Sequence, residues 1–463
     1  MEKEPLTLPE VLGGYAESGA ARFHMPGHKG RGMAGFMSEK TALWDVTEIS
    51  ITDNLQSPHG AIAEGQKRLA AAYGAYRSYY VVNGSTGALQ AMILSLGKDE
   101  KLLLLRDCHK SAVSAAILSG IETCFLSPAY NEKLDLLEPV TPAALDAALA
   151  ETRATAVLVT SPNYYGLCAD LAGLSKVAHA HGALLLVDGA HGAHFPFSNA
   201  LPAGCAPYAD LFCHSQHKTM NALTQAASLH IMDCRVRPEH VRHALSILQT
   251  TSPSYLLMTS IDWAIYAARR QDWAGLAARM DAFRARTAKL PGLALLPENL
   301  PGEGGRDPTR LVIDVSGRGI TGREALSCLE KRNIYIEMAD LWRIVLITSP
   351  EDDPAWYARL YDAFRSLPYG RLTRGERTLP QFTPKRRMSV REAALSETER
   401  VPLEKAGGRT AAEAIGVYPP GISLLVPGEI LPEDIALRLT GGADWGAEFF
   451  GLADGLVTVV KDI

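Results

Sequence analysis

The sequence predicts an α/β fold whose large domain holds a mainly parallel sheet covered by helices. Short apolar segments alternate with helical patterns between about residues 79 and 232, as in sheets of this kind. Several segments are apolar throughout, which is typical of strands buried on both faces. The predicted strands are Tyr79–Val82, Leu102–Leu105, Ala156–Thr160, Ala183–Asp188, Leu211–His214 and Ser228–Met232.

Two smaller units are predicted after this sheet. A helical pattern from about Ser254 to Leu290 carries the chain away from the sheet, and a basic, Gly- and Pro-rich segment, Pro368–Arg387, is typical of a linker. The elements expected between them are strands Arg310–Val315, Ile334–Glu337 and Arg343–Thr348 and helices Arg323–Lys331 and Ala355–Ser366. The last unit is expected to contain the strand Ile422–Val426.

These patterns divide the chain into four parts. We expect an N-terminal arm (1–55), a large domain that holds the mainly parallel sheet (56–253), a small α+β domain (254–370), and a linker with a C-terminal α+β domain (371–463).

The composition is that of a soluble enzyme. Of 463 residues, 47% are hydrophobic and 21% are charged, and the formal net charge is −5, so no overall charge favours nucleic acid or an anionic membrane. The N-terminal residues contain no apolar leader, no run approaches a membrane-spanning length, and the seven cysteines form no C-x-x-C pair. We therefore expect a cytoplasmic enzyme with reduced thiols, no metal site and a small-molecule substrate.

Lys218 and Asp188 both lie where an apolar strand is predicted to end. Lysine is almost never buried without a partner, so Lys218 is either functional or an exposed loop residue beside His217. Ligands of open α/β sheets bind at the carboxyl ends of strands, where the carboxylate of Asp188 could hold a heterocyclic nitrogen protonated. The structural alternative for Asp188 is a helix N-cap.

Two further motifs follow predicted strands. Asn83–Gln90 is a turn of small residues before an apolar helix, and its backbone N–H groups with the hydroxyls of Ser85 and Thr86 suit a phosphate. It lacks the spacing and the lysine of a P-loop, and a plain capped helix start has the same pattern. His109 follows the next strand, where a histidine either stacks on a flat aromatic cofactor or serves as a hydrogen-bonded structural residue.

Together these motifs supply a phosphate cradle, a stacking platform, an acid for a ring nitrogen and a lysine amine. Pyridoxal phosphate requires all four, because its pyridinium accepts electrons from a bond at the α-carbon of an amino acid while the protein positions it. We therefore expect a pyridoxal-phosphate enzyme.

In its motifs and their order the sequence resembles the ornithine/lysine/arginine decarboxylase family, within the aspartate-aminotransferase-like enzymes of fold type I. The resemblance rests on Phe23–Gly30, Gly84–Gly87, Cys108–Ser111, Thr160–Gly166, Val187–Gly192, Ser215–Thr219, Tyr418–Ile422 and Val426–Glu429. It implies decarboxylation of arginine, lysine or ornithine to the matching polyamine or diamine and CO2, in a homodimer with shared active sites.

The same resemblance implies a role for each matching residue. Lys218 would form the Schiff base with the cofactor, Asp188 would pair with the pyridine nitrogen, and His109 would stack on the ring. His191 would lie near the phenolic oxygen or the substrate carboxylate. The residues implied to bind the phosphate are Gly84, Ser85, Thr86, Gly87, Ser215 and His217.

Three features depart from the family pattern. Gly189 stands where Glu is usual, which puts local electrostatics and substrate choice in doubt, and Asp107 replaces a commoner Asn. The N-terminal wing of the larger bacterial enzymes is absent, which favours a dimer over a decamer.

Three acidic residues are candidates for substrate capture. A basic side chain that leaves water needs a carboxylate at its far end, and Glu48, Asp53 and Glu429 could provide one at the entrance of a site shared between subunits. Ordinary surface acidity explains each of them equally well.

Alternative functions fit parts of the pattern. An aminotransferase or a β-eliminating lyase would use the same cofactor residues, but His24–Gly30 and the Pro-Pro-Gly strand resemble the decarboxylases. A metal hydrolase would use paired histidines such as His214 and His217, yet no H-E-x-x-H helix accompanies them. A non-catalytic homologue commonly loses its lysine or its phosphate contacts, and both are present here. The identity of the basic substrate and of the proton donor is left open.

Overall fold

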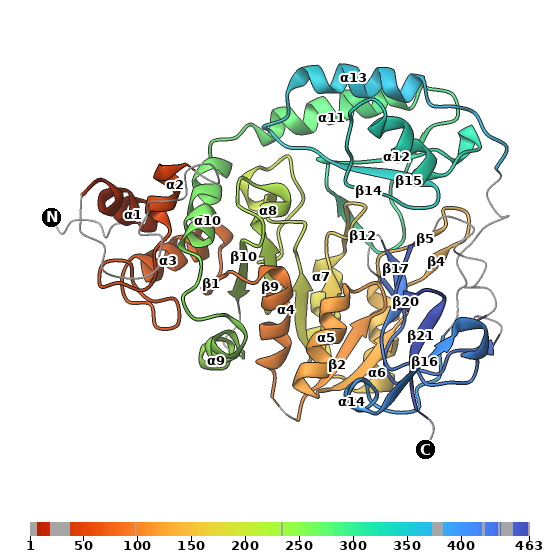
Figure 1. The fold of residues 1–463 in the computed structure, drawn as a ribbon, viewed down its shortest axis with the longest axis horizontal. Coiled ribbons are helices and arrows are strands. Elements are labelled where there is room, and N and C mark those ends of the chain that lie inside the picture. The colour runs from red at the N-terminus through yellow and green to blue at the C-terminus, as the bar shows by residue number, and fades with distance from the viewer. Residues whose placement is uncertain are drawn as a thin grey trace. The chain divides into compact units, whose positions relative to one another are not determined.

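The computed structural model describes residues 7–18, 38–97, 99–232, 235–372, 383–418, 422–433, 436 and 448–461. Figure 1 labels the helices and strands along the chain. The chain forms two compact units, each assembled from separate stretches of sequence. The first contains Met1–Gly97, Leu184–Asn199 and Ala203–Gln271, and the second contains Lys98–Ala183, Ala200–Pro202 and Asp272–Ile463. The four-part division expected from the sequence stays a prediction.

The first unit is built on strands in the order β1-β10-β9-β8. Their bounds are Arg77–Val81 (β1), Leu184–Asp188 (β8), Leu211–Ser215 (β9) and Ala227–Ile231 (β10). Every residue of β9 and β10 is buried, as their apolar sequences predict. β8 runs parallel to β9, whereas β10 is antiparallel to both β9 and β1. The four strands predicted in this region are therefore confirmed, and one of them runs against the others' direction.

Helices of the first unit cover and extend these strands. α4 (Gly84–Leu94) follows β1 and packs on β9, β10 and α9 (Pro238–Leu248). α3 (Ala61–Tyr73) packs against β1, with α1 (Leu8–Glu17) and α10 (Tyr255–Ala268) beside it. α2 is Glu39–Trp44. A single turn, α8 (Gln216–Thr219), follows β9 directly and carries Lys218.

The second unit contains the parallel strands β6-β2-β3. Their bounds are Ala156–Thr160 (β6), Lys101–Leu105 (β2) and Glu122–Leu126 (β3). The helices of this region are α5 (Lys110–Ser119), α6 (Pro142–Thr152) and α7 (Leu171–Ala180). Two short pairs complete it: β4 (Tyr130–Asn131) with β5 (Leu136–Leu137), and β7 (Leu167–Ala169) with β12 (Glu303–Arg306). β6 and β2 confirm the predicted strands, and β3 was not predicted.

A four-stranded antiparallel sheet of the second unit has the order β11-β13-β15-β14. Its bounds are Ala294–Leu295 (β11), Arg310–Asp314 (β13), Met338–Ala339 (β14) and Arg343–Ile347 (β15), and its helices are α11 (Trp273–Thr287), α12 (Gly322–Glu330) and α13 (Pro354–Arg365). The predicted strand Ile334–Glu337 is wrong. Asn333 turns the chain with φ 57°, and Tyr335 after it is 76% exposed, so this segment lies outside the sheet.

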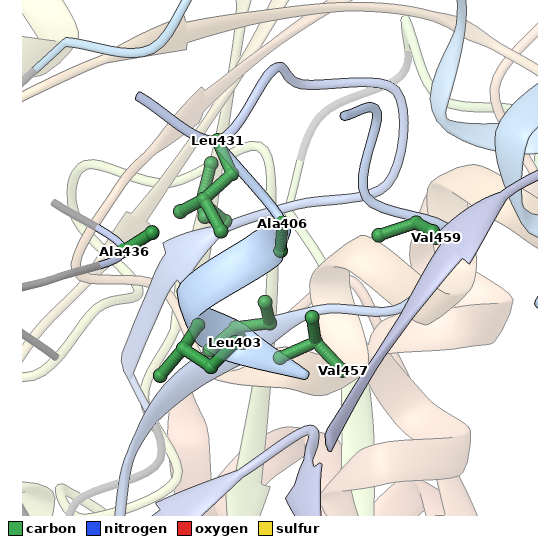
Figure 2. Close-up of a cluster of buried hydrophobic side chains, with 8 residues drawn as sticks. Leu403, Ala406, Leu431, Ala436, Val457 and Val459 are labelled. Atoms are coloured by element: carbon green, nitrogen blue, oxygen red, sulfur yellow. The ribbon is translucent and has the colours of Figure 1, made fainter. Parts of the chain in front are cut away.

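The C-terminal part of the second unit has its own small core. Strands β16 (Thr398–Pro402), β20 (Leu452–Ala453) and β21 (Leu456–Val460) form one sheet, and β17 (Ile415–Tyr418), β18 (Ile422–Leu425) and β19 (Glu448–Phe450) form another. Figure 2 shows the buried apolar side chains that include Leu403, Leu431 and Val457. α14 (Val390–Leu395) packs on α5 of the same unit.

Candidate active site

Lys218 lies at the carboxyl end of β9, in the single turn α8, and its side chain contacts His191. The distance between Lys218 Nζ and His191 Nε2 is 3.0 Å, and His191 is only 4% exposed. His191 follows the neighbouring parallel strand β8, so both residues lie at the same sheet edge. The structure thus brings together a lysine amine and an imidazole that the sequence separates by 27 residues.

Asp188 is the last residue of β8 and is 5% exposed. Its Oδ1 accepts hydrogen bonds from the backbone N–H of Ala190, at 3.1 Å, and from the thiol of Cys213, at 3.8 Å. Burial, reinforced by the charge of Asp188, raises the pKa of the Cys205 thiol to about 12 and the pKa of the Cys213 thiol well above its ordinary value. Both thiols stay neutral beside the carboxylate, and Asp188 does not cap a helix.

The N-terminus of α4 forms the third part of the site. Gly84 begins the helix with φ 70°, which favours glycine. Asn83 gives no side-chain cap to this helix; its amide donates to the carbonyl of Leu248 instead, at 3.0 Å. Ser85 in the first turn accepts a hydrogen bond from the hydroxyl of Ser215, at 2.8 Å. Backbone N–H groups and two hydroxyls thus gather where a helix of eleven residues begins.

These residues fit pyridoxal phosphate. A helix N-terminus without a side-chain cap suits its phosphate, a buried carboxylate suits its ring nitrogen, and a partly buried lysine suits its aldehyde. When bound, the cofactor supplies an electron sink for a bond broken at the α-carbon of an amino acid. The role of each residue remains a prediction.

His217 and His109, the other histidines expected at the site, make local contacts. The Nδ1 of His217 lies 3.1 Å from the carbonyl oxygen of Ala226. Burial lowers the pKa of His217, and the nearby charge of Lys218 adds to this. His109 belongs to the second unit, where its Nδ1 accepts from the backbone N–H of Ser111 at 3.2 Å and so caps α5. Its stacking role stays a prediction.

The three acidic residues proposed for substrate capture each have a partner. Asp53 accepts from the backbone N–H groups at the start of α3, including those of Gly60 at 2.8 Å and Ile62 at 3.0 Å. Glu48 accepts from the backbone N–H of Ser252 at 2.8 Å. Glu429, in the second unit, is 1% exposed and forms an ion pair with Arg106. These contacts give each residue a structural role, and the substrate role stays a prediction.

A layer of buried rings in the first unit was not predicted from the sequence. The ring of Tyr73 lies 4.7 Å from that of His214 and 4.6 Å from that of His230, between centroids. Phe212 stacks on His230 at 4.5 Å. Burial lowers the pKa of His214 to about 3 and that of His230 well below the ordinary value. The sequence signal that could have revealed this layer is the presence of His214 and His230 inside otherwise apolar strands.

Part of the family pattern lies outside the described residues, namely Phe23–Gly30 and residues 419–421. Within the ranges that are described, no group of three or more His, Cys, Asp or Glu side chains is placed to hold a metal ion. Among the described helices, none is both long enough and apolar enough to span a membrane.

Comparison with known proteins identifies a family and relatives to which this chain is similar. Residues 5–290 match the Orn/Lys/Arg decarboxylase major domain, and residues 372–453 match the C-terminal domain of the same family. An arginine decarboxylase of Bacillus subtilis (strain 168) is 32% identical over 100% of this chain and 99% of its own length. An arginine decarboxylase of Halalkalibacterium halodurans is 36% identical over 93% of this chain and 92% of its own length.

Solved structures share the fold. The constitutive lysine decarboxylase of E. coli aligns with a TM-score of 0.83 at 21% identity, covering 98% of this chain and 82% of the other. A serine palmitoyltransferase of Sphingomonas wittichii aligns over 65% of this chain with a TM-score of 0.51 and 18% identity. The expected fold class, an α/β fold of type I with a mainly parallel sheet and smaller α+β parts, is confirmed.

Proposed function

The chain belongs to the ornithine/lysine/arginine decarboxylase family, and we propose that arginine is its substrate. The enzyme depends on pyridoxal phosphate and removes CO2 from a basic amino acid. Arginine is favoured because four relatives that are 32–36% identical over at least 89% of this chain are named arginine decarboxylase. Two relatives named lysine decarboxylase are 26% and 22% identical. The product would be agmatine.

One observation supports the site assignment most strongly. Lys218 contacts His191 at the sheet edge where the buried Asp188 ends a strand, and these residues follow or end two neighbouring parallel strands. In this assignment Lys218 holds the cofactor covalently, and His191 orients the side-chain amine of Lys218. Asp188 keeps the ring nitrogen protonated, since a buried carboxylate forms a strong charge-assisted hydrogen bond with a cationic N–H.

The phosphate belongs at the start of α4. Backbone N–H groups from Gly84 to Gly87 donate to it, and the helix dipole favours its charge. Gly87 suits a tightly turned chain, because a Cβ there would lie 2.8 Å from the Cβ of Asn83. Ser85, Thr86, Ser215 and His217 supply side-chain donors, supported by the hydrogen bond that already links Ser215 to Ser85.

We extend the proposal to the assembly and location of the enzyme. It acts as a homodimer with shared active sites, in which His109 stacks on the cofactor and Glu48, Asp53 or Glu429 receives the cationic end of the substrate. It works in the cytoplasm, an environment that suits six described cysteines of which none is in a disulfide.

A substrate comparison tests the central choice. Purified enzyme saturated with pyridoxal phosphate is given arginine, lysine or ornithine in separate assays, and CO2 and the matching amine are quantified. We expect kcat/KM for arginine to exceed that for the other two by at least roughly tenfold, about 1.4 kcal/mol of discrimination. Lys218→Ala is the control for background release. Equal or faster turnover of lysine or ornithine would refute the choice of arginine.

A further inference from the structure

A chain of buried hydrogen bonds leads from the strand β1 to the turn that carries Lys218. The residues of this chain, here called the polar relay, are Ser78, His230, Ser228 and Gln216. Ser78 Oγ lies 2.7 Å from His230 Nδ1, His230 Nε2 lies 2.7 Å from Ser228 Oγ, and Gln216 Nε2 donates to Ser228 Oγ at 2.6 Å. Ser78 is 5% exposed, and the other three are fully enclosed.

The donors and acceptors of the polar relay are compatible with one another. Burial, with His214 adding to it, lowers the pKa of His230 well below its ordinary value, so the imidazole is neutral and carries one N–H. The amide of Gln216 donates to Ser228, whose own proton is then available for Nε2 of His230. In the matching tautomer the Nδ1–H of His230 donates to Ser78, whereas in the other tautomer the hydroxyl of Ser78 donates to Nδ1. Both tautomers of His230 preserve all three links of the polar relay.

The relay ends at an element that is weak by itself. α8 has four residues, and one of its backbone hydrogen bonds joins Met220 N to Gln216 O at 2.8 Å. So short a helix has no stability of its own, because nucleating a turn costs more than one hydrogen bond returns. Gln216 is the first residue of α8 and Lys218 is the third. The side chain of Gln216 therefore anchors the turn to β10.

The same buried layer also contacts the loop that carries His191. The hydroxyl of Tyr73 donates to the carbonyl of Ala193 at 2.8 Å, while its ring packs on His230 at 4.6 Å between centroids. Both partners of the Lys218–His191 contact are thus attached to one buried layer.

We propose that Gln216, Ser228 and His230 are positioning residues, which hold the turn of Lys218 in place before the cofactor binds. All three are fully enclosed, and in this proposal they act through the backbone of α8 rather than by contact with substrate or cofactor. Because a misplacement of about 1 Å can cost roughly 100-fold in rate, such an anchor matters to the chemistry. The inference rests on the proposed role of Lys218 as the cofactor lysine.

Hydrogen exchange of the apoprotein tests the anchor without any cofactor. Ser228→Ala removes the middle of the polar relay, and we expect the backbone amides of residues 216–220 to exchange at least tenfold faster. Ser95→Ala is the matched control, since Ser95 is also buried in the first unit but donates only to the nearby carbonyl of Met92 at 2.7 Å. Gln216→Met keeps the side-chain volume and replaces Ser228→Ala if that variant does not fold.

Attachment of the cofactor provides the second readout. After pyridoxal phosphate is added to apoprotein, borohydride-trapped label on Lys218 should accumulate about tenfold more slowly in Ser228→Ala than in wild type, and kcat should fall with little change in KM. Ser228→Thr, which retains the hydroxyl, should recover most of the rate. Adding Gln216→Met to Ser228→Ala should have little further effect, because both break the same link.

The outcomes distinguish a failure of the positioning role from a failure of the Lys218 assignment. Wild-type exchange at residues 216–220 in both relay variants, or the same acceleration in Ser95→Ala, overturns the positioning role. Additive effects of the two relay substitutions on attachment also overturn it. If wild-type protein carries the label on another lysine, the assignment of Lys218 fails, while the exchange data still decide whether the polar relay anchors α8.

Discussion

The amine of Lys218 and the Nε2 atom of His191 lie 3.0 Å apart, although the two residues follow different strands. They meet because β8 and β9 are neighbouring parallel strands, so that the loops after both strands leave the same sheet edge. Asp188, the last residue of β8, is buried at this edge. The contact thus joins the proposed cofactor lysine to the loop that follows the proposed ring-nitrogen acid.

Asp188→Asn should leave the fold and cofactor content intact while lowering kcat by at least roughly 100-fold, about 2.7 kcal/mol of barrier. An amide of the same size cannot hold a ring nitrogen protonated. Cofactor stoichiometry and single-turnover rates are the measurements. A variant that binds the cofactor fully and turns over at nearly the wild-type rate would contradict the assignment.

Gly189→Ala should destabilise the protein by about 1–3 kcal/mol through overpacking. A Cβ at Gly189 would lie 2.9 Å from the sulfur of Cys205 and 3.0 Å from both Cys213 O and His214 Cδ2. This crowding gives a physical reason for glycine where the family usually has Glu. Gly14→Ala is the control, because a Cβ there meets nothing within 4 Å. Equal urea midpoints for wild type and Gly189→Ala would be inconsistent with this packing.

Glu429→Ala should lower the free energy of unfolding by about 3–5 kcal/mol, since it leaves the guanidinium of Arg106 buried without its partner. The side chains of Arg106 and Glu429 are 11% and 2% exposed. The double variant Arg106→Met/Glu429→Leu should regain most of the loss. Exposed Glu413→Ala serves as the control.

Substitution of Glu429 also tests its proposed substrate role. A residue that receives the substrate's cation would raise KM for arginine when neutralised, whereas a structural ion pair would change stability and leave KM nearly unchanged. A raised KM in Glu429→Gln at wild-type stability would favour substrate binding. Loss of stability alone would remove Glu429 from the substrate site.

Asp262→Asn should change how stability depends on pH. Burial raises the pKa of Asp262 from 3.8 to about 6, while Tyr80 donates a hydrogen bond to it. Between these values the folded state keeps a proton that the unfolded state has lost, so wild-type stability falls as pH rises through this window, by about 3 kcal/mol in total.

The Asn variant lacks this titration, so its stability relative to wild type should rise between pH 4 and pH 7. Urea unfolding at the two pH values measures the difference, and exposed Asp281→Asn controls for the loss of a charge. A constant difference at both pH values would show that Asp262 titrates alike in both states.

Apolar segments predicted burial well and strand direction poorly. β8 and β9 lie within one residue of their predicted bounds, and all their residues except Leu184 are buried. The same apolar pattern in β10 carries no information on direction, and this strand runs antiparallel. β3 escaped prediction since Glu122 and Thr123 interrupt its apolar character. Ile334–Glu337 was also predicted as a strand, but the turn at Asn333 places it outside the sheet.

For the site, motifs at strand ends pointed to Lys218, Asp188 and His191, whose proximity follows from parallel strand order. The polar relay could not be read from the sequence, because Ser78 and His230 become neighbours only when β1 pairs with β10. Likewise Gln216 reaches Ser228 only through the pairing of β9 with β10. Contacts across antiparallel pairs depend on register, which a single sequence does not specify.

Borohydride reduction of the cofactor-loaded enzyme, followed by peptide mapping, tests the central claim most directly. A covalent cofactor is fixed to the lysine that holds it, so the reduced pyridoxyl group should be found on Lys218 at about one equivalent per chain. Lys218→Ala should carry no label and have lost most of its activity. Label on a different lysine of the wild-type protein, or undiminished labelling of Lys218→Ala, would contradict the account.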